Sequence, residues 1–183
     1  NRGTTLGIGK YKIYTVEHLL SAVYAHGIDN LFIEIDNVEP PILDGSSIDF
    51  YNGILRSGIK KYSDKKKQIK IKKPIYFLDS DNDVEMSILP YDGFKITFNA
   101  SFDYGNNRNQ SFVLDDIKNY FQEISSARTF CSFNELHYLK TNNLIKGASL
   151  ESGLVFMNEN ITNDKINNIN DLFNLSVKHK DSF

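Results

Sequence analysis

Cysteine is almost absent from the 183-residue sequence, which contains one, Cys131, and only four histidines. A lone cysteine can form no internal disulfide and cannot build a thiolate zinc cage. We therefore expect a reducing compartment, and any bound metal must be held by histidine and carboxylate side chains. Nothing nearby in the sequence would activate the thiol, so we interpret Cys131 as a packing residue.

Long apolar runs and an excess of one charge are also missing. No window approaches the roughly 18 uninterrupted apolar residues of a membrane helix, and the first residues lead into no signal-type apolar core. The 21 Lys and Arg residues nearly balance the 23 Asp and Glu residues, for a formal net charge of -2. No global field therefore draws the chain to nucleic acid or to an anionic membrane. We expect a soluble, cytoplasmic protein with no stable membrane insertion and no nucleic-acid partner.

The sequence does have the balance of a globular protein, with 40% hydrophobic and 13% aromatic residues. Its length fits one domain or two small ones. Residues 60–67 have the lysine-rich composition of a linker, and the pattern changes to strands after them. We therefore predict a domain boundary near 62–67, with domains at residues 1–62 and 67–183.

Both halves combine predicted helices and strands. Apolar residues recur at helical spacing between Thr15, the expected N-cap, and Gly27, which suits a left-handed helix end. Turn residues at 44–47 separate an alternating strand at 31–36 from a second helix at 48–56. The second half predicts strands at 68–78, 83–89, 94–102 and 153–157, and helices near 115–125, 133–141 and 169–180. Small sheets layered with helices place the chain in the α+β class.

The dipeptide Glu17-His18 is the first candidate for chemistry, because it lies in the first turn of a well-signalled helix. A histidine at a helix start is more commonly just a partly exposed polar residue. The functional alternative is a metal ligand, His18, beside a carboxylate that takes a proton from metal-bound water. The second imidazole would then come from His179, near the end of the last amphipathic segment.

Other motifs carry weaker signals. The basic run from Lys65 to Lys73 alternates with isoleucines, so a solvated strand face is favoured over an RNA site. Ser46 and Ser47 lack the surroundings of a nucleophile elbow, which gives a serine hydrolase little support.

Several ordered sequence blocks resemble the UDP-3-O-acyl-N-acetylglucosamine deacetylases, the zinc amidases of the committed step in lipid A biosynthesis. The resemblance extends from about Thr5 to Lys180 and is carried by residues 15–22 (TVEHLLSA), 27–30 (GIDN), 39–46 (EPPILDGS), 126–130 (SARTF), 144–150 (LIKGASL) and 177–180 (VKHK). It implies an active site in the cleft between the two domains.

The resemblance also implies roles for individual residues. His18 and His179 match two zinc ligands, and Glu17 matches the general base. Thr129 matches the hydroxyl that helps hold the oxyanion, and Lys180 a lysine that contacts substrate near the metal. The implied substrate is an acylated UDP-glucosamine, a small molecule, and the implied cofactor is Zn²⁺.

Further residues match the family's substrate-binding positions. Phe130 matches an aromatic residue near the sugar, and Phe102 one near the uridine. The family holds its fatty acyl chain in an apolar passage within an insert near residues 129–157. The matching positions are Phe133, Leu136, Ile145, Ser149, Gly153 and Val155.

The sequence departs from the family at both ends. The family's third zinc ligand is an aspartate four residues after the second histidine, where this chain has Phe183, while Asp181 is only two residues on. The family's catalytic acid lies still further on, and family strands precede the first block. We therefore expect a chain truncated at both ends relative to the family. The alternative to an enzyme is an incomplete or non-catalytic homologue that binds a nucleotide-sugar or acyl ligand.

Overall fold

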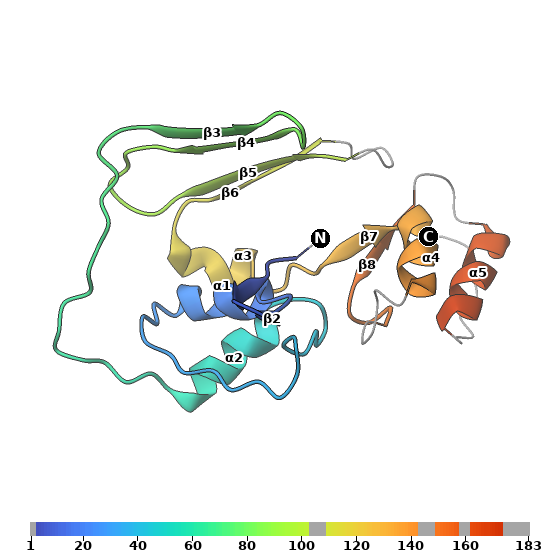
Figure 1. Ribbon diagram of the computed structural model, residues 1–183, viewed down its shortest axis with the longest axis horizontal. Helices are drawn as coiled ribbons and strands as arrows, with labels where there is room; N and C mark the ends of the chain where they lie inside the picture. Colours follow the sequence, from blue (N-terminus) through green and yellow to red (C-terminus); the bar gives the residue numbers. More distant parts are fainter. Residues whose placement is uncertain (1–2, 103–108, 143–148, 158–161, 174–183) are drawn as a thin grey trace.

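A computed structural model describes residues 3–102, 109–142, 149–157 and 162–173 of the protein. Helices and small, separate two-stranded sheets alternate along the chain, which confirms the α+β class (Figure 1). Within the described residues, no helix has the length and apolar character to cross a membrane. The domain limits remain a prediction.

The first half begins with an antiparallel hairpin of β1 (Leu6–Ile8) and β2 (Tyr11–Ile13), followed by α1 (Glu17–Ala25). The predicted helix end is confirmed, since Gly27 has φ +67°. The predicted N-cap is wrong, because Val16 occupies that position. Thr15 has φ 54°, and its hydroxyl instead donates a hydrogen bond to Glu39 Oε2 at 3.1 Å. A β-branched residue in this region is strained, so the approach to α1 is fixed by its surroundings rather than by helix propensity.

The second predicted helix is confirmed as α2 (Ile48–Ser57), which ends at Gly58 with φ +76°. α2 lies beside α1, and the ring of His26 stacks on Tyr51 with a centroid distance of 4.1 Å (Figure 1). The Nε2 atom of His26 lies 3.0 Å from the Tyr51 carbonyl oxygen and donates to it. His26, the residue after α1, therefore links α1 to α2.

The predicted strand at 31–36 is wrong. None of the described strands pairs with this segment, and Phe32 is 84% exposed. A strand is stabilised by the ladder it forms with a neighbour, and alternation of apolar residues cannot replace that partner.

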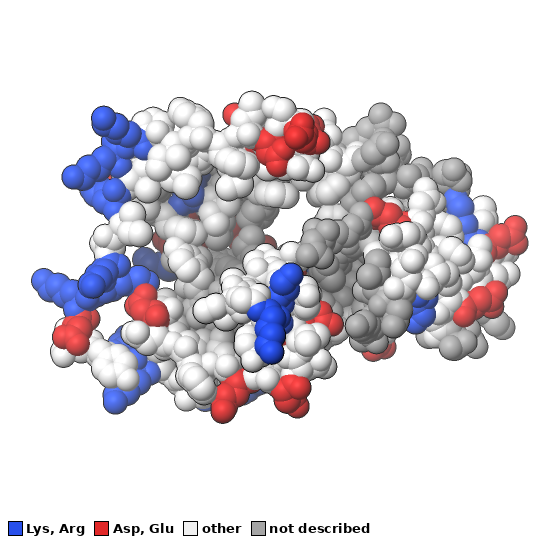
Figure 2. All heavy atoms as spheres, viewed as in Figure 1, with Lys and Arg blue, Asp and Glu red and all other residues white. Residues whose placement is uncertain are grey.

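The connection over residues 58–74 forms neither helix nor strand. The strand predicted at 68–78 is therefore wrong at its start, because the observed strand begins at Ile75. Figure 1 shows the connection running along the left edge of the molecule, where Figure 2 shows lysine and arginine side chains gathered. Two antiparallel hairpins follow it. They consist of β3 (Ile75–Asp79) with β4 (Val84–Ile88), and β5 (Ile96–Ser101) with β6 (Asn109–Leu114).

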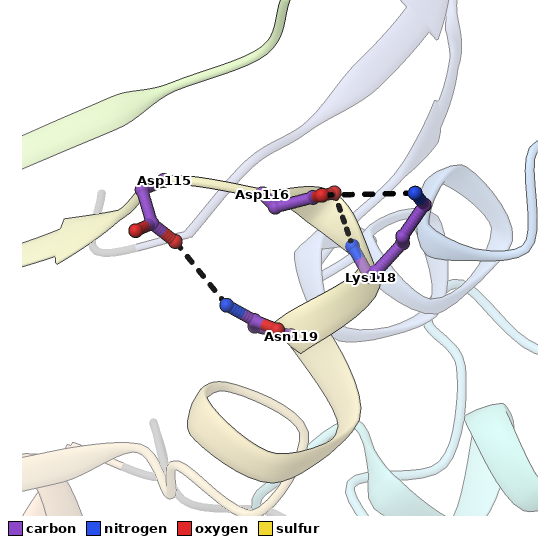
Figure 3. Close-up of polar contacts among 4 residues, drawn as sticks. All are labelled: Asp115, Asp116, Lys118 and Asn119. Carbon is purple, nitrogen blue, oxygen red and sulfur yellow. Dashed lines mark hydrogen bonds and ion pairs between the residues drawn. The ribbon is translucent and has the colours of Figure 1, made fainter.

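A short helical segment leads away from the hairpins, as predicted for 115–125. It comprises the 3₁₀ turn η1 (Ile117–Asn119) and α3 (Tyr120–Glu123). Asp116 is the N-cap, because its carboxylate accepts a hydrogen bond from the Lys118 backbone N–H at 2.9 Å (Figure 3). Asp115 accepts a second bond, from the Asn119 side chain at 3.2 Å.

The last part of the described chain is a βαβ unit followed by a helix. β7 (Phe130–Ser132) pairs in parallel with β8 (Leu154–Phe156), and α4 (Phe133–Thr141) lies between them in sequence. α4 spans the predicted residues because Ser132 and Glu135 form a capping box. α5 (Asn163–Phe173) begins earlier than the helix predicted at 169–180, and residues 174–183 lie outside the described residues.

Buried side chains are few and include several serines. The buried apolar residues among those described are Val16, Ala22, Leu114, Tyr120, Leu136 and Ile169, and the buried polar ones are Ser46, Ser47, Ser125, Ser132 and Ser152. Ser47, at the end of the turn at 44–47, hydrogen-bonds to Tyr120 and to the carbonyl oxygen of Ser125, so hydroxyl groups occupy the place where α1, α2 and α3 meet.

Candidate active site

A pocket of about 730 Å³ brings together segments that lie far apart in the sequence. One wall comes from residues 36–42, and the other from β7, α4 and residues 149–155. Six of the predicted site residues line it: Thr129, Phe130, Leu136, Ser149, Gly153 and Val155. Phe133 lies on α4 but is not among the lining residues, and Ile145 lies outside the described residues.

Other lining residues were missed at the sequence level. They are mostly apolar: Val38, Pro40, Pro41, Ile42, Cys131, Leu139, Leu150, Leu154 and Phe173. The block at 39–46 was a usable signal, because its prolines and isoleucine form the wall opposite the predicted residues. Phe173 had no such signal: the helix predicted at 169–180 includes it, but nothing in the sequence pattern placed that helix beside the pocket.

The dipeptide Glu17-His18 lies at the start of α1, where the N–H groups of the first turn have no partner within the helix. Both residues are half-buried. Glu17 Oε2 accepts a hydrogen bond from the Thr4 backbone N–H at 2.9 Å, which fixes the direction of the carboxylate. Neither residue lines the pocket. Thr15, which lies just before α1, does line it, and its hydrogen bond to Glu39 connects the start of α1 to the pocket wall.

A chain of hydroxyl groups supports the backbone of His18. The Ser21 hydroxyl donates to the His18 carbonyl oxygen at 2.9 Å and lies 2.8 Å from the Tyr120 hydroxyl. Tyr120 is buried, and its hydroxyl also lies 2.6 Å from Ser47 Oγ. Three hydroxyl hydrogens serve these contacts and the one from Ser47 to the Ser125 carbonyl oxygen, so either oxygen of each Tyr120 pair can be the donor. Helix α3 therefore fixes the carbonyl of a candidate metal ligand, a link that the sequence did not predict.

Thr129 is held by its backbone while its side chain is exposed. Its N–H donates to the Gly45 carbonyl oxygen at 2.7 Å, and its own carbonyl oxygen accepts from the Leu154 N–H at 2.9 Å. The residue thus lies between the turn at 44–47 and β8, with a hydroxyl that solvent or a ligand can reach.

The two predicted sugar and uridine contacts lie together in an aromatic cluster. Phe102 meets Phe130 edge-to-face with a centroid distance of 5.3 Å, and Phe130 meets Phe156 in the same way at 5.4 Å. A second, smaller pocket of about 300 Å³ lies at this cluster, and Gln110 and Arg128 are among its lining residues.

The described residues contain no group of three His, Cys, Asp or Glu side chains that could hold a metal ion. His179 and Lys180 lie outside the described residues, as does Asp181. Histidine and carboxylate donors are the types that Zn²⁺ takes, and His18 with its neighbour Glu17 supplies one of each at an accessible helix start. The donor types at residue 18 and its neighbour therefore fit zinc.

Comparison with known proteins finds one family model and relatives that are named as deacetylases. A family model described as UDP-3-O-acyl N-acetylglycosamine deacetylase matches residues 1–180. The UDP-3-O-acyl-N-acetylglucosamine deacetylase of Thermodesulfovibrio yellowstonii is 41% identical over 153 residues, which are 83% of this chain and 52% of the relative. That of Nautilia profundicola is 40% identical over 164 residues, 89% of this chain and 56% of the relative.

A bifunctional enzyme LpxC/FabZ of Chlorobaculum tepidum is 34% identical over 181 residues, 97% of this chain and 38% of the relative. The chain thus spans about half the length, or less, of the curated relatives it matches. Because one family model covers nearly all of its residues, the protein belongs to the UDP-3-O-acyl-N-acetylglucosamine deacetylase family.

Proposed function

We propose that the protein hydrolyses the N-acetyl group of a UDP-3-O-acyl-N-acetylglucosamine, releasing acetate and a free amine, as the committed step of lipid A biosynthesis. The observation that carries the proposal is the pocket of about 730 Å³, in which Thr129 lies next to a mostly apolar wall from α4 and β8. A hydroxyl beside an apolar pocket suits a substrate that joins a reactive amide to a fatty acyl chain. The sequence has one cysteine and therefore no internal disulfide, which is compatible with a cytoplasmic reaction.

In the proposed reaction, water attacks the acetamide carbonyl and Glu17 takes the proton that the water loses. The hydrogen bond from the Thr4 backbone N–H orients the carboxylate for this role. The Thr129 hydroxyl donates to the oxygen that becomes negatively charged as the tetrahedral intermediate forms. Lys180 contacts the substrate near the reacting group. Glu17 then returns the proton that it took to the nitrogen as the carbon–nitrogen bond breaks, which releases the free amine and acetate.

Zinc is proposed as the cofactor, with His18 and His179 as ligands. A zinc ion bound there would lower the pKa of a bound water to about 7 and polarise the amide carbonyl. The hydrogen bond from Ser21 to the His18 carbonyl oxygen fixes the backbone from which one imidazole projects. Ser21 thus helps to orient the proposed ligand His18.

The rest of the proposed substrate occupies the two pockets. The acyl chain lies along Phe133, Leu136, Ile145, Ser149, Gly153 and Val155, of which the described pocket-lining members are mostly apolar. The sugar and uridine lie at the aromatic cluster of Phe102 and Phe130, where ring faces and edges offer stacking surfaces.

The test compares two variants of neighbouring residues. Glu17→Gln should retain bound zinc and lower kcat by about 10²- to 10⁴-fold, because it removes the proton acceptor and keeps the shape. His18→Ala should lose zinc as well as turnover. Acetate release from the acylated UDP-sugar and metal content by elemental analysis are the two measurements.

The control is Arg56→Lys, an exposed change on α2 that should affect neither measurement. Equal loss of zinc in both variants would contradict the separate roles. A zinc-loaded wild-type protein that binds the acylated UDP-sugar without releasing acetate would favour the non-catalytic homologue instead.

A further inference from the structure

The position of Thr129 depends on two segments that are remote from it in sequence. The turn at 44–47 supplies the carbonyl oxygen of Gly45 to its N–H, and β8 supplies the N–H of Leu154 to its carbonyl oxygen. Because both backbone groups are used, Thr129 can neither shift nor rotate without losing a hydrogen bond. The geometry of its hydroxyl therefore depends on how firmly the two outer segments are joined.

Arg128 joins the same two segments directly. Its Nε donates to the carbonyl oxygen of Asp44 at 2.8 Å, and its Nη2 donates to the carbonyl oxygen of Glu151. The planar guanidinium presents these donors at a fixed angle, whereas a lysine ammonium is a single point on a flexible stem. One arginine side chain thus bridges the turn at 44–47 and residues 149–153 immediately beside Thr129.

Glycine at position 45 allows this close approach. Gly45 has φ +83°, and a Cβ added there would lie 2.0 Å from the carbonyl oxygen of Ser152 and 3.3 Å from Thr129 Cγ2. Any side chain would push the turn away from both. The residues on either side of this contact, Ser46 and Ser152, are fully or almost fully buried, so there is no room for a compensating movement.

We propose that Arg128 is a positioning residue for Thr129: its bridge between the Asp44 and Glu151 carbonyl oxygens sets the place of the Thr129 hydroxyl in the pocket. The catalytic part of this inference rests on the proposed function, in which that hydroxyl donates to the oxyanion. Arg128 also lines the smaller pocket, but both donors named here are used by backbone carbonyl oxygens, so the bridge acts on Thr129 through the backbone.

The kinetic test uses Arg128→Lys, which keeps the charge and removes the two-point bridge. A displaced hydroxyl should lower kcat by about 10- to 100-fold, while KM for the acylated UDP-sugar stays within about twofold. In a Thr129→Val background, the same Arg128→Lys change should lower kcat by less than about twofold, because the group it positions is gone. Effects that multiply in the double variant would overturn the proposal.

A second measurement does not depend on turnover. Amide hydrogen exchange at Thr129 and Leu154 should become about tenfold faster in Arg128→Lys, while the amide of Leu20 in α1 keeps its wild-type rate. Arg56→Lys is the matched control and should leave all three amides unchanged. Unchanged exchange at Thr129, or faster exchange throughout the protein, would overturn the positioning role. A wild-type protein without deacetylase activity would refute the proposed function, and the exchange rates would still decide whether Arg128 holds Thr129.

Discussion

Asp44 stabilises the turn at 44–47 through its side chain. Its Oδ1 accepts hydrogen bonds from the backbone N–H and the hydroxyl of Ser46, at 2.9 and 2.7 Å. Burial raises the pKa of the carboxyl, but these bonds and the nearby Arg128 charge outweigh burial and hold the pKa below its usual 3.8. The ionised side chain therefore stabilises the turn that carries the Gly45 carbonyl.

This lowered pKa predicts a pH-dependent stability. A carboxyl whose pKa is lower in the folded state stabilises the protein above the unfolded-state pKa, and that contribution is lost as the pH falls through the folded-state pKa. Asp44→Asn should therefore be less stable than wild type near neutral pH, and the difference should shrink below about pH 4. Urea unfolding at several pH values measures it. A difference that is the same at pH 7 and at pH 3 would show that the charge of Asp44 is not involved.

The sequence identified site residues that match a family position better than residues whose role is to contact partners remote in sequence. Thr129 was recognisable within a sequence block, and Leu136 and Gly153 by their match to family positions; all three line the described pocket. Tyr120 and Arg128 were not identified, because each acts on partners remote in sequence. Such pairing depends on tertiary packing, which leaves no periodic pattern in either partner.

At the scale of elements, helices with complete end signals were predicted well. α2 and α4 begin and end within a residue of the expected positions, with a glycine end for α2 and a capping box for α4. Strands were predicted less well. The segment at 31–36 has a strand's alternation but no described partner, and β1, β2, β6 and β7 were missed. A helix satisfies its hydrogen bonds within itself, whereas a strand needs a neighbour that the local sequence does not specify.

The βαβ unit of β7, α4 and β8 forms the apolar side of the pocket, which leads to a prediction about acyl chains. A Cβ at Gly153 would meet the carbonyl oxygen of Thr129 no closer than 3.5 Å, so Gly153→Asp fits sterically and places a charge at the pocket wall. If the acyl chain lies there, kcat/KM should fall by about 10- to 100-fold for long-chain substrates and much less for short-chain ones.

The matched control is Gly53→Asp on α2, where an added Cβ meets nothing within 4 Å. It should leave the dependence on chain length unchanged. Equal losses for long- and short-chain substrates in Gly153→Asp would place the acyl chain elsewhere.

At the scale of the whole molecule, packing is concentrated below the two large hairpins (Figure 1). Tyr51 on α2 stacks against Tyr120 on α3 with a centroid distance of 5.8 Å, and Ser47 binds both Tyr120 and the carbonyl of Ser125. Many apolar side chains of β3 and β4 are exposed, including Phe77 and Met86. The sequence thus predicted that these segments form strands, but neither their pairing with each other nor the exposure of their apolar side chains.

The exposed, lysine-rich connection over residues 58–74 has a practical consequence. It has no helix or strand of its own, and its contacts from Lys66 to Asp29 and from Lys70 to Asp92 are surface ion pairs of little energetic weight. Limited trypsin digestion should therefore cut there first. The two pieces should still elute together in gel filtration, because α1 and α2 remain packed on α3, and separate elution would show that this packing is too weak. A chain that survives such a nick could be produced as two polypeptides and reassembled, with different isotopes or labels in each.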